Sequence, residues 1–406
     1  MLAAIMRSPV DPSNDTSWHR SIEDRWCGVG CSSQPDAQTA GAEAAAGAIA
    51  APDAKLIIVF ASDAHDAEPL LAGIRGVTRE VPLIGCSTAG EITPAGPADA
   101  SVVIVALGGP GFTVATAKAS TQSGSGQAGE DVAGCLRQIE APHKILVMLP
   151  DSTLPNHQEI VRGAYSQAGA AIPVVGGFAA EGGLRLHRPF QLCDGRATEK
   201  TVVAAAIGST GPFGIGVRHG WQPVGKPMAI GWDANSRISR LDDEPALDAY
   251  LKRLDAPDDV YWDPYLFDRF KQTRPLGLVR DEGEEGIRAV GDPNFEDRTL
   301  GVQAIDVPEG GLVWVMEGDA TSMLDAADAA CRDALDAIGK PPLGLVVFDC
   351  SGRKYVLGRH RGTEVAGIAA LAAGAPVAGF YSYGEIATWR GPSGYHHGTL
   401  VVMALG

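Results

Sequence analysis

Residues 84–92 read IGCSTAGEI, and residues 378–386 read AGFYSYGEI. Aligned without gaps, the two stretches share a glycine at the second position (Gly85 and Gly379), a hydroxyl at Thr88 and Ser382, and a closing Gly-Glu-Ile. A match of nine residues alone does not establish an internal repeat. A repeat is indicated when the sequence around the match recurs as well, so that a whole structural unit is duplicated.

We call these two nine-residue stretches, 84–92 and 378–386, the phrases. Their surroundings recur as well. Before each phrase come an apolar strand pattern, a helical stretch and a proline, and a second apolar strand follows it. The strand patterns are KLIIVF (55–60) and SVVIVAL (101–107) in one copy, and LGLVVF (343–348) and TLVVMAL (399–405) in the other. Each copy is thus a strand–helix–strand unit, and such units are typical of α/β proteins.

A third, looser copy lies between these two. Its strands are KILVMLP (144–150) and TVVAAAIG (201–208), and IPVVGGFAAEGG (172–183) takes the place of the phrase. The Gly-Glu-Ile is replaced by Ala-Glu-Gly, so Glu181 is the glutamate that survives nearby. We predict an α/β fold with two domains, whose mixed and largely parallel sheets are built from these repeated units.

The length of 406 residues exceeds what one ordinary core supports. We expect a disordered N-terminal tail over 1–22 and domains over 23–238 and 239–406, the second starting at a capped helix near 240–254. The charged, glycine-rich segment 272–298 indicates a solvated hairpin or loop.

Composition excludes several classes of protein. The net charge of −16 disfavours nucleic acid and anionic membrane surfaces as partners. No apolar run is long enough to span a membrane. The seven cysteines are odd in number and scattered, which predicts a reducing, cytoplasmic setting without a disulfide framework.

Ligands of open α/β sheets bind at the carboxyl ends of strands, where both phrases fall. The candidate ligand-binding residues there combine hydroxyls, acids, one arginine and one histidine: Ser87, Thr88, Glu91, Asp349, Arg353, Ser382, Tyr383, Glu385 and His397. Acids would hold an ammonium group, and Arg353 a carboxylate. The alternative is structural: the hydroxyls close their own turns, and Arg353 pairs with Asp349 or Glu364.

Motifs for other chemistries are weak or missing. There is no P-loop and no GxSxG nucleophile elbow. A GxGxxG pattern at Gly124, Gly126 and Gly129 lies too far from its strand for a dinucleotide fingerprint. Adjacent His396 and His397 point to opposite faces of a strand, which disfavours a metal site. We expect no cofactor, no metal and no catalytic residue.

Several further segments, in this order, resemble the FIST family, which pairs an N-terminal with a C-terminal FIST domain. They are VGCSSQPDA, GWQPVGKP, LDDEPALDAYLKRL, FDCSGRKYVLG and GFYSYGEIATW followed by HHGTLVVMAL. The resemblance implies a cytoplasmic sensory module for small ligands such as amino acids.

Three functional hypotheses follow. The first is a stand-alone sensory protein that binds a small polar metabolite, such as a zwitterionic amino acid, and signals through a separate partner protein. The second is an enzyme that uses paired carboxylates with a His or Cys in the same pocket. The third is a scaffold that contacts a protein partner through 272–298 and has no enclosed polar pocket.

Overall fold

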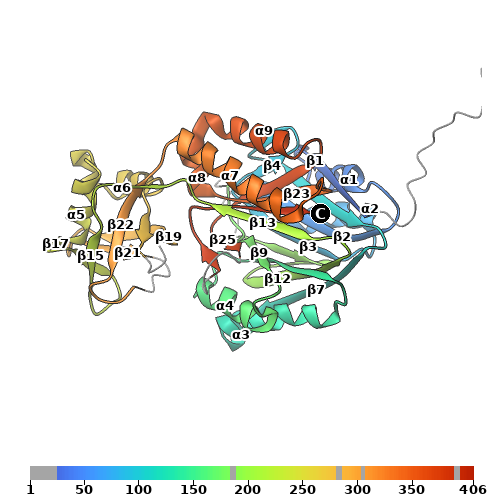
Figure 1. Ribbon diagram of the computed structural model, residues 1–406, viewed down its shortest axis with the longest axis horizontal. Coiled ribbons are helices and arrows are strands. Elements are labelled where there is room, and N and C mark those ends of the chain that lie inside the picture. The colour runs from blue at the N-terminus through green and yellow to red at the C-terminus, as the bar shows by residue number, and fades with distance from the viewer. Residues whose placement is uncertain (1–24, 183–188, 280–285, 303–306, 388–393) are drawn as a thin grey trace, which may run out of the picture.

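The computed structural model of the protein describes residues 25–182, 189–279, 286–302, 307–387 and 394–406. The described chain is α/β, as predicted, with mixed sheets. Three six-stranded sheets form a main body, and a fourth sheet belongs to a smaller unit at its side (Figure 1). The predicted tail over 1–22 lies outside the described residues.

The three sheets of the main body share one strand order. The orders are β1-β6-β2-β3-β10-β11, β7-β12-β8-β9-β25-β26 and β13-β27-β23-β24-β4-β5. Each sheet therefore contains an edge strand, a closing strand, a parallel pair and a hairpin. The three copies predicted from sequence are thus three repeats of one structural unit, including the looser middle copy.

The first repeat contains β1 (Trp26–Ser32), α1 (Ala37–Ala48), β2 (Ala54–Ser62), α2 (Ala67–Thr78), β3 (Leu83–Thr88), β4 (Glu91–Thr93), β5 (Gly96–Ala98) and β6 (Val102–Gly108). The second contains β7 (Phe112–Ser120), α3 (Ser125–Ala133), β8 (His143–Pro150), α4 (His157–Ala168), β9 (Val174–Gly177), β10 (Gln191–Cys193), β11 (Arg196–Thr198) and β12 (Thr201–Ser209). The third contains β13 (Phe213–Arg218), α7 (Ala320–Ile338), β23 (Gly344–Cys350), α8 (Ser351–Leu357), α9 (Arg361–Leu371), β24 (Val377–Ser382), β25 (Glu385–Ala387), β26 (Tyr395–His396) and β27 (Leu400–Leu405).

Each repeat gives its hairpin to the sheet of another repeat. The hairpin β4–β5 pairs with β24 of the third repeat, β25–β26 with β9 of the second, and β10–β11 with β3 of the first. Backbone hydrogen bonds repeat the same cycle: Ala89 N–H donates to Tyr381 O at 3.0 Å, Tyr383 N–H to Phe178 O at 3.2 Å, and Ala180 N–H to Ser87 O at 3.0 Å. The three phrases consequently meet where the strands β3, β9 and β24 end.

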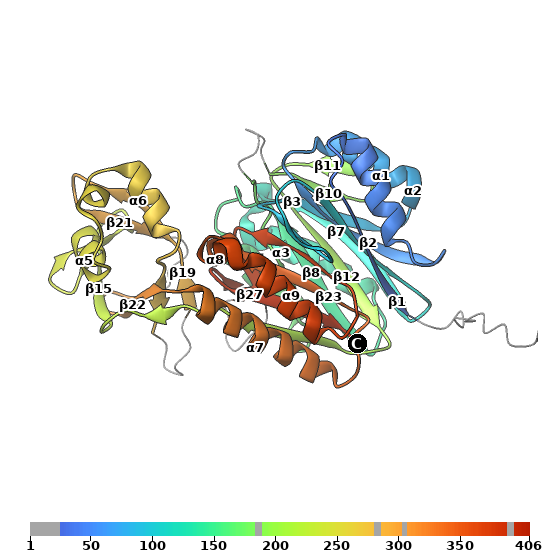
Figure 2. The same cartoon turned by 90° about the horizontal axis from the view of Figure 1, so that it is seen from above.

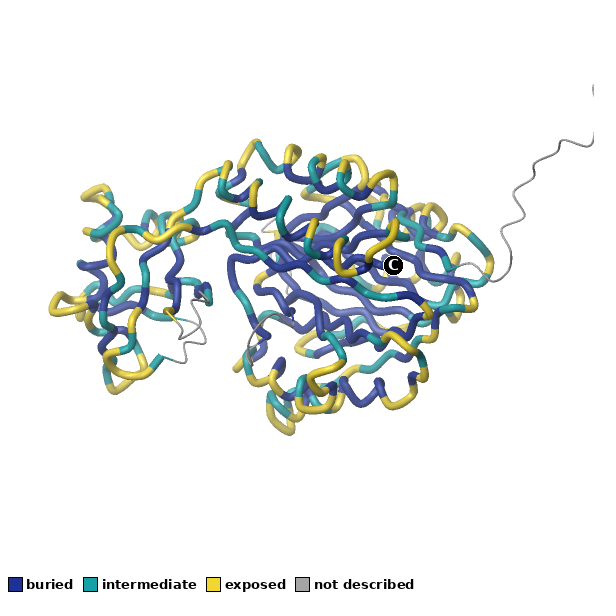
Figure 3. The backbone as a smooth tube through the Cα atoms, in the orientation of Figure 1, coloured by how far each residue is buried: buried dark blue, intermediate teal, exposed yellow. Residues whose placement is uncertain are grey.

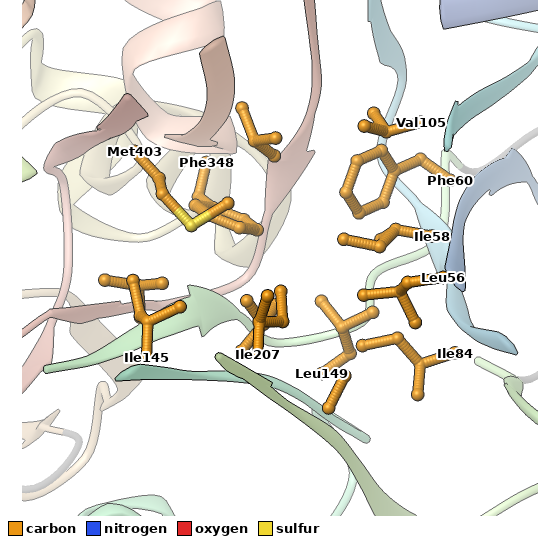
Figure 4. Packing of buried hydrophobic residues seen from close by; sticks show 14 of the residues in the cluster. Leu56, Ile58, Phe60, Ile84, Val105, Ile145, Leu149, Ile207, Phe348 and Met403 are labelled. Atoms are coloured by element: carbon orange, nitrogen blue, oxygen red, sulfur yellow. The ribbon is translucent and has the colours of Figure 1, made fainter. Parts of the chain in front are cut away.

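The inner faces of the three sheets share one apolar core (Figure 4). The rings of Phe60, Phe348 and Phe380 pack there, with Phe60 stacked on Phe380 at 4.8 Å. The helices cover the outer faces: α1 and α2 one sheet, α3 and α4 the second, and α7 with α9 the third (Figure 1 and Figure 2). With both faces covered, the central strands are buried along their length (Figure 3), which explains their uniformly apolar sequences.

The smaller unit is an insertion in the third repeat, between β13 and α7. Its core is separate from that of the main body and gathers residues such as Leu247, Tyr250 and Phe267. We call this unit the insert. It contains β14 (Gln222–Pro223), β15 (Met228–Trp232), β16 (Ile238–Leu241), β17 (Glu244–Pro245), α5 (Ala246–Arg253), α6 (Pro264–Lys271), β18 (Leu276–Leu278), β19 (Gly286–Arg288), β20 (Val290–Asn294), β21 (Thr299–Val302) and β22 (Leu312–Glu317).

A smaller fraction of the strand pairs is parallel than the sequence predicts. Among the described strands, the parallel pairs are β2–β3, β8–β9 and β23–β24, one for each repeat. The other pairings are antiparallel because the closing strand, the edge strand and the exchanged hairpin all run against their neighbours. The domain boundary near residue 238 stays a prediction; it falls within the insert.

Candidate functional site

The glutamates of the two phrases are buried, and their carboxylate oxygens accept hydrogen bonds from residues of the same repeat. The Glu91 carboxylate accepts hydrogen bonds from the Thr88 hydroxyl and from the backbone and hydroxyl of Ser101, the latter at 3.0 and 2.7 Å. Glu385 accepts from the Ser382 hydroxyl at 2.7 Å and from both donors of Thr399 at 3.0 Å. Each glutamate therefore ties its turn to the start of the closing strand.

The second repeat has a glutamine at this place. Gln191 begins β10 as Glu91 begins β4 and Glu385 begins β25, and its side chain accepts a hydrogen bond from Thr201 at 3.3 Å. Thr201 starts the closing strand β12. The structural counterpart of the two glutamates is thus Gln191, whereas Glu181, the glutamate that is nearby in the sequence, follows β9.

Burial changes the acidity of both glutamates. Loss of hydration raises the pKa of Glu91 to about 7, against the opposing effect of its hydrogen bonds from Thr88 and Ser101. The same cause raises the pKa of Glu385 to about 8. Near neutral pH the carboxyl of Glu385 is therefore largely protonated and that of Glu91 about half protonated, which weakens both as partners for a ligand ammonium group.

Arg353 is also engaged within the protein. Its guanidinium is fully buried between Asp349, at 2.7 Å, and Glu364, at 2.5 Å. Its other N–H groups donate to His219 O at 2.6 Å and to the Met323 sulfur and carbonyl oxygen at 3.0 and 3.1 Å. All donors of the guanidinium are used, which matches the structural alternative of an ion pair.

The hydrogen-bond partners of Arg353 lie on both connections between the main body and the insert. His219 lies where the chain enters the insert, and Met323 lies in the first turn of α7, where the chain has left it. Burial raises the pKa of Asp349 and of Glu364, the latter also because Asp349 is its neighbour. Asp349 and Glu364 thus hold the guanidinium in place. Through His219 and Met323, the guanidinium in turn anchors both connections of the insert to the main body.

A cavity of about 480 Å³ lies between the main body and the insert. It opens at the carboxyl ends of β8, β9, β23 and β24, where an α/β sheet is expected to hold a ligand. The main body lines it with Ser152, Thr153, His157, Glu181, Pro189, Trp221, Cys350, Ser351, Gly352, Tyr355, Tyr383, His397 and Gly398. The insert lines it with Lys271, Gln272, Pro275, Ile287, Ala289 and Val290.

Two of the candidate residues line this cavity, Tyr383 and His397. Tyr383 donates its hydroxyl hydrogen to Glu181 O at 2.9 Å. His397 is 5% exposed, and its Nε2 has no hydrogen-bond partner among the described residues. Burial lowers the pKa of His397 well below its usual value, with further lowering by Arg288, so the imidazole is neutral. The other candidates are buried away from the cavity: Ser87, Thr88, Glu91, Asp349, Arg353, Ser382 and Glu385.

Several lining residues were not among the candidates. His157 contacts Tyr395 through Nδ1 at 2.9 Å and the Ser152 carbonyl through Nε2 at 3.0 Å. In the sequence, Glu181 stands out only as the glutamate of the third, looser copy. The wall from 287–290 belongs to a segment that looked like a solvated loop, and the sequence held no signal that the insert folds back over the sheet ends.

The cysteines near the sheet ends are poor nucleophiles. Cys350 lines the cavity, but burial raises its pKa well above the usual value, and the nearby Glu385 adds to this. Burial has the same effect on Cys86, which packs in the shared core. Both thiols are therefore protonated at neutral pH.

Comparison with known proteins identifies the family to which this sequence is similar. Residues 55–244 match the FIST N domain, and residues 246–388 match the FIST C domain. The chain is also 28% identical over 402 residues to uncharacterized proteins from two strains of Mycobacterium tuberculosis, CDC 1551 and H37Rv. Each alignment covers 93% of this chain and 98% of the relative. Among the described helices, none is long and apolar enough to cross a membrane.

Proposed function

Since the chain belongs to the FIST family, whose domains are generally described as sensory domains of signal-transduction proteins, we propose that it senses a small polar metabolite in the cavity between main body and insert. The proposed ligand is an amino acid or a related zwitterion. The proposed setting is the cytoplasm, and the proposed output is contact with a separate signalling protein.

The observation that carries this proposal is the lining of the cavity. Glu181 and Lys271 bring opposite charges to its walls, and His397 adds a buried, neutral ring nitrogen. Lys271 lies 3.1 Å from Asp268 and 2.9 Å from Asp292, whose side chains are 54% and 92% exposed. Because both carboxylates are solvated, a ligand carboxylate could compete with them for the Lys271 ammonium group. A volume of about 480 Å³ lies within the usual range of ligand pockets.

A location between two bodies also suits a sensor. A ligand that contacts both walls stabilises one relative position of the insert and the main body, and it can shift the population only through such differential contacts. Arg353 holds both connections of the insert close to the cavity. A bound ligand is therefore positioned to change how the insert sits, and a partner protein can detect that change.

A thermal-shift screen of the full chain against the twenty common amino acids tests the proposal. A true ligand at a hundredfold excess over its dissociation constant stabilises the folded state by about 2.7 kcal/mol. The variant Glu181→Gln should lose most of this shift, and the exposed control Glu140→Gln should keep it. The proposal fails if no amino acid or related zwitterion raises the melting temperature, or if both variants respond like the parent protein.

A further inference from the structure

We propose that the ligand of this cavity is amphiphilic: an amino acid with an apolar side chain, whose charged head lies between the main body and Lys271 and whose side chain lies against the apolar residues of the insert. The inference rests on the proposed function and narrows it to a ligand class. It comes from the unequal distribution of polar groups over the two walls.

The wall from the main body is rich in hydrogen-bonding groups. Ser152, Ser351 and Tyr355 bring hydroxyls, Glu181 a carboxylate, and His397 an imidazole whose buried Nε2 has no hydrogen-bond partner among the described residues. His397 is held by an edge-to-face contact with Tyr395 at 4.7 Å. A buried polar atom without a partner is costly, so this wall favours the polar end of a ligand.

The wall from the insert is mostly apolar. Apart from Lys271 and Gln272, the insert contributes Pro275, Ile287, Ala289 and Val290. These residues come from neighbouring segments: Pro275 precedes β18, Ile287 lies in β19 opposite Gly277 of β18, and Ala289 links β19 to β20. They offer carbon atoms and no side-chain hydrogen bond, so a polar ligand group placed here would lose its water without gaining a partner.

The two walls together therefore discriminate between ligands of equal size. Leucine and asparagine have the same branching pattern and share the zwitterionic head, but the side chain of leucine is apolar and that of asparagine is an amide. The head contacts are available to both. Against the insert, the apolar side chain of leucine is favoured, by at least about tenfold in affinity, as is usual for hydrophobic pockets.

Isothermal titration calorimetry of the full chain with L-leucine and L-asparagine tests the inference. We expect leucine to bind at least about tenfold more tightly. The variant Ala289→Asp places a carboxylate on the partly exposed apolar wall and should weaken leucine binding by a similar factor. The matched control Ala234→Asp, at an exposed turn of the insert, should bind leucine like the parent protein.

The outcomes separate this inference from the proposed function. Equal or tighter binding of asparagine overturns the inference and leaves the sensory proposal standing. Undiminished leucine binding by Ala289→Asp also overturns it, because the ligand would then lie elsewhere. If neither amino acid binds, the inference is wrong, and the thermal-shift screen decides separately whether another zwitterion occupies the cavity.

Discussion

The carboxyl group of Glu385 shows how a conspicuous residue can serve the fold. It lies between the Ser382 hydroxyl and both donors of Thr399, and the Ser382 hydroxyl can also donate to Asp349 O at 3.2 Å. In the protonated form, the carboxyl O–H donates to Ser382, and the serine hydrogen is free for Asp349. The protonated form therefore satisfies the whole chain of hydrogen bonds.

This arrangement predicts a stability that falls with rising pH. The pKa of Glu385 is raised from 4.5 to about 8 in the folded protein. Between these values the folded state keeps a proton that the unfolded chain releases, so this contribution is full below pH 4.5 and is lost as pH rises through about 8. We expect Glu385→Gln, which copies the protonated form and the natural Gln191, to be at least about 1 kcal/mol more stable than the parent protein at pH 8.5. Urea denaturation at pH 5 and pH 8.5 measures the difference.

The control for this prediction is Glu385→Ala, which removes the hydrogen bonds and should destabilise the protein at both pH values. Lower stability of Glu385→Gln than of the parent protein at pH 8.5 would show that the ionised carboxylate is the form required by the fold.

Arg353 gives a second prediction at the residue scale. Its replacement leaves Asp349 and Glu364 buried without a counter-charge, and removal of one member of a buried ion pair usually costs about 3–5 kcal/mol. We expect a loss of this size for Arg353→Met in urea denaturation. The matched control is Arg332→Met, because Arg332 pairs with Asp328 at 4.0 Å on an exposed helix face and such pairs contribute about 0–1 kcal/mol. Equal losses for the two variants would contradict the anchoring role.

At the scale of secondary-structure elements, close approach of the parallel strands depends on one glycine in each repeat. A Cβ atom on Gly379 would lie 1.9 Å from Val347 O, and one on Gly176 would lie 1.9 Å from Met148 O. On Gly85 it would lie 2.8 Å from Val59 O. These glycines are the ones that make the phrases recognisable as copies, since the geometry of the strand pair tolerates no side chain there.

We therefore expect Gly379→Ala to destabilise the protein by about 2 kcal/mol or more, because overpacking against backbone cannot relax easily. Gly76→Ala is the control: it lies in α2 with nothing within 4 Å of the added Cβ, and alanine is the better helix former by about 1 kcal/mol. Thermal unfolding of both variants tests whether the melting temperature falls for Gly379→Ala and rises for Gly76→Ala. A neutral Gly379→Ala would contradict the close strand approach.

The elements also show what could be predicted from the sequence. Each strand–helix–strand unit is local, and its apolar pattern, its capping residues and its glycines are visible in the sequence; Asp36, for example, caps α1 by accepting a hydrogen bond from Thr39 N–H. The exchange of hairpins was not predictable in this way. β4 pairs with β24 almost three hundred residues away, and nothing in a three-residue strand specifies that partner. The cavity depends on such long-range contacts, so only Tyr383 and His397 were anticipated.

At the scale of the whole molecule, the insert is an addition to a threefold repeat. Its first and last strands are neighbours, with Gln222 opposite Glu317, so a short linker can replace it. We expect a variant with 222–317 replaced by a short Gly/Ser linker to keep the circular dichroism of a folded α/β protein and to unfold cooperatively, since the shared core of the main body contains no residue of the insert. Loss of cooperative unfolding would contradict the separation of the two cores.

The central claim is that a ligand binds between the main body and the insert, and hydrogen–deuterium exchange of the full chain with and without L-leucine tests it most directly. We predict slower exchange in two places together: around 350–355 and 395–398 of the main body, and around 271–276 and 286–290 of the insert. Slower exchange in only one of the two bodies, or at a site away from these segments, would contradict the claim.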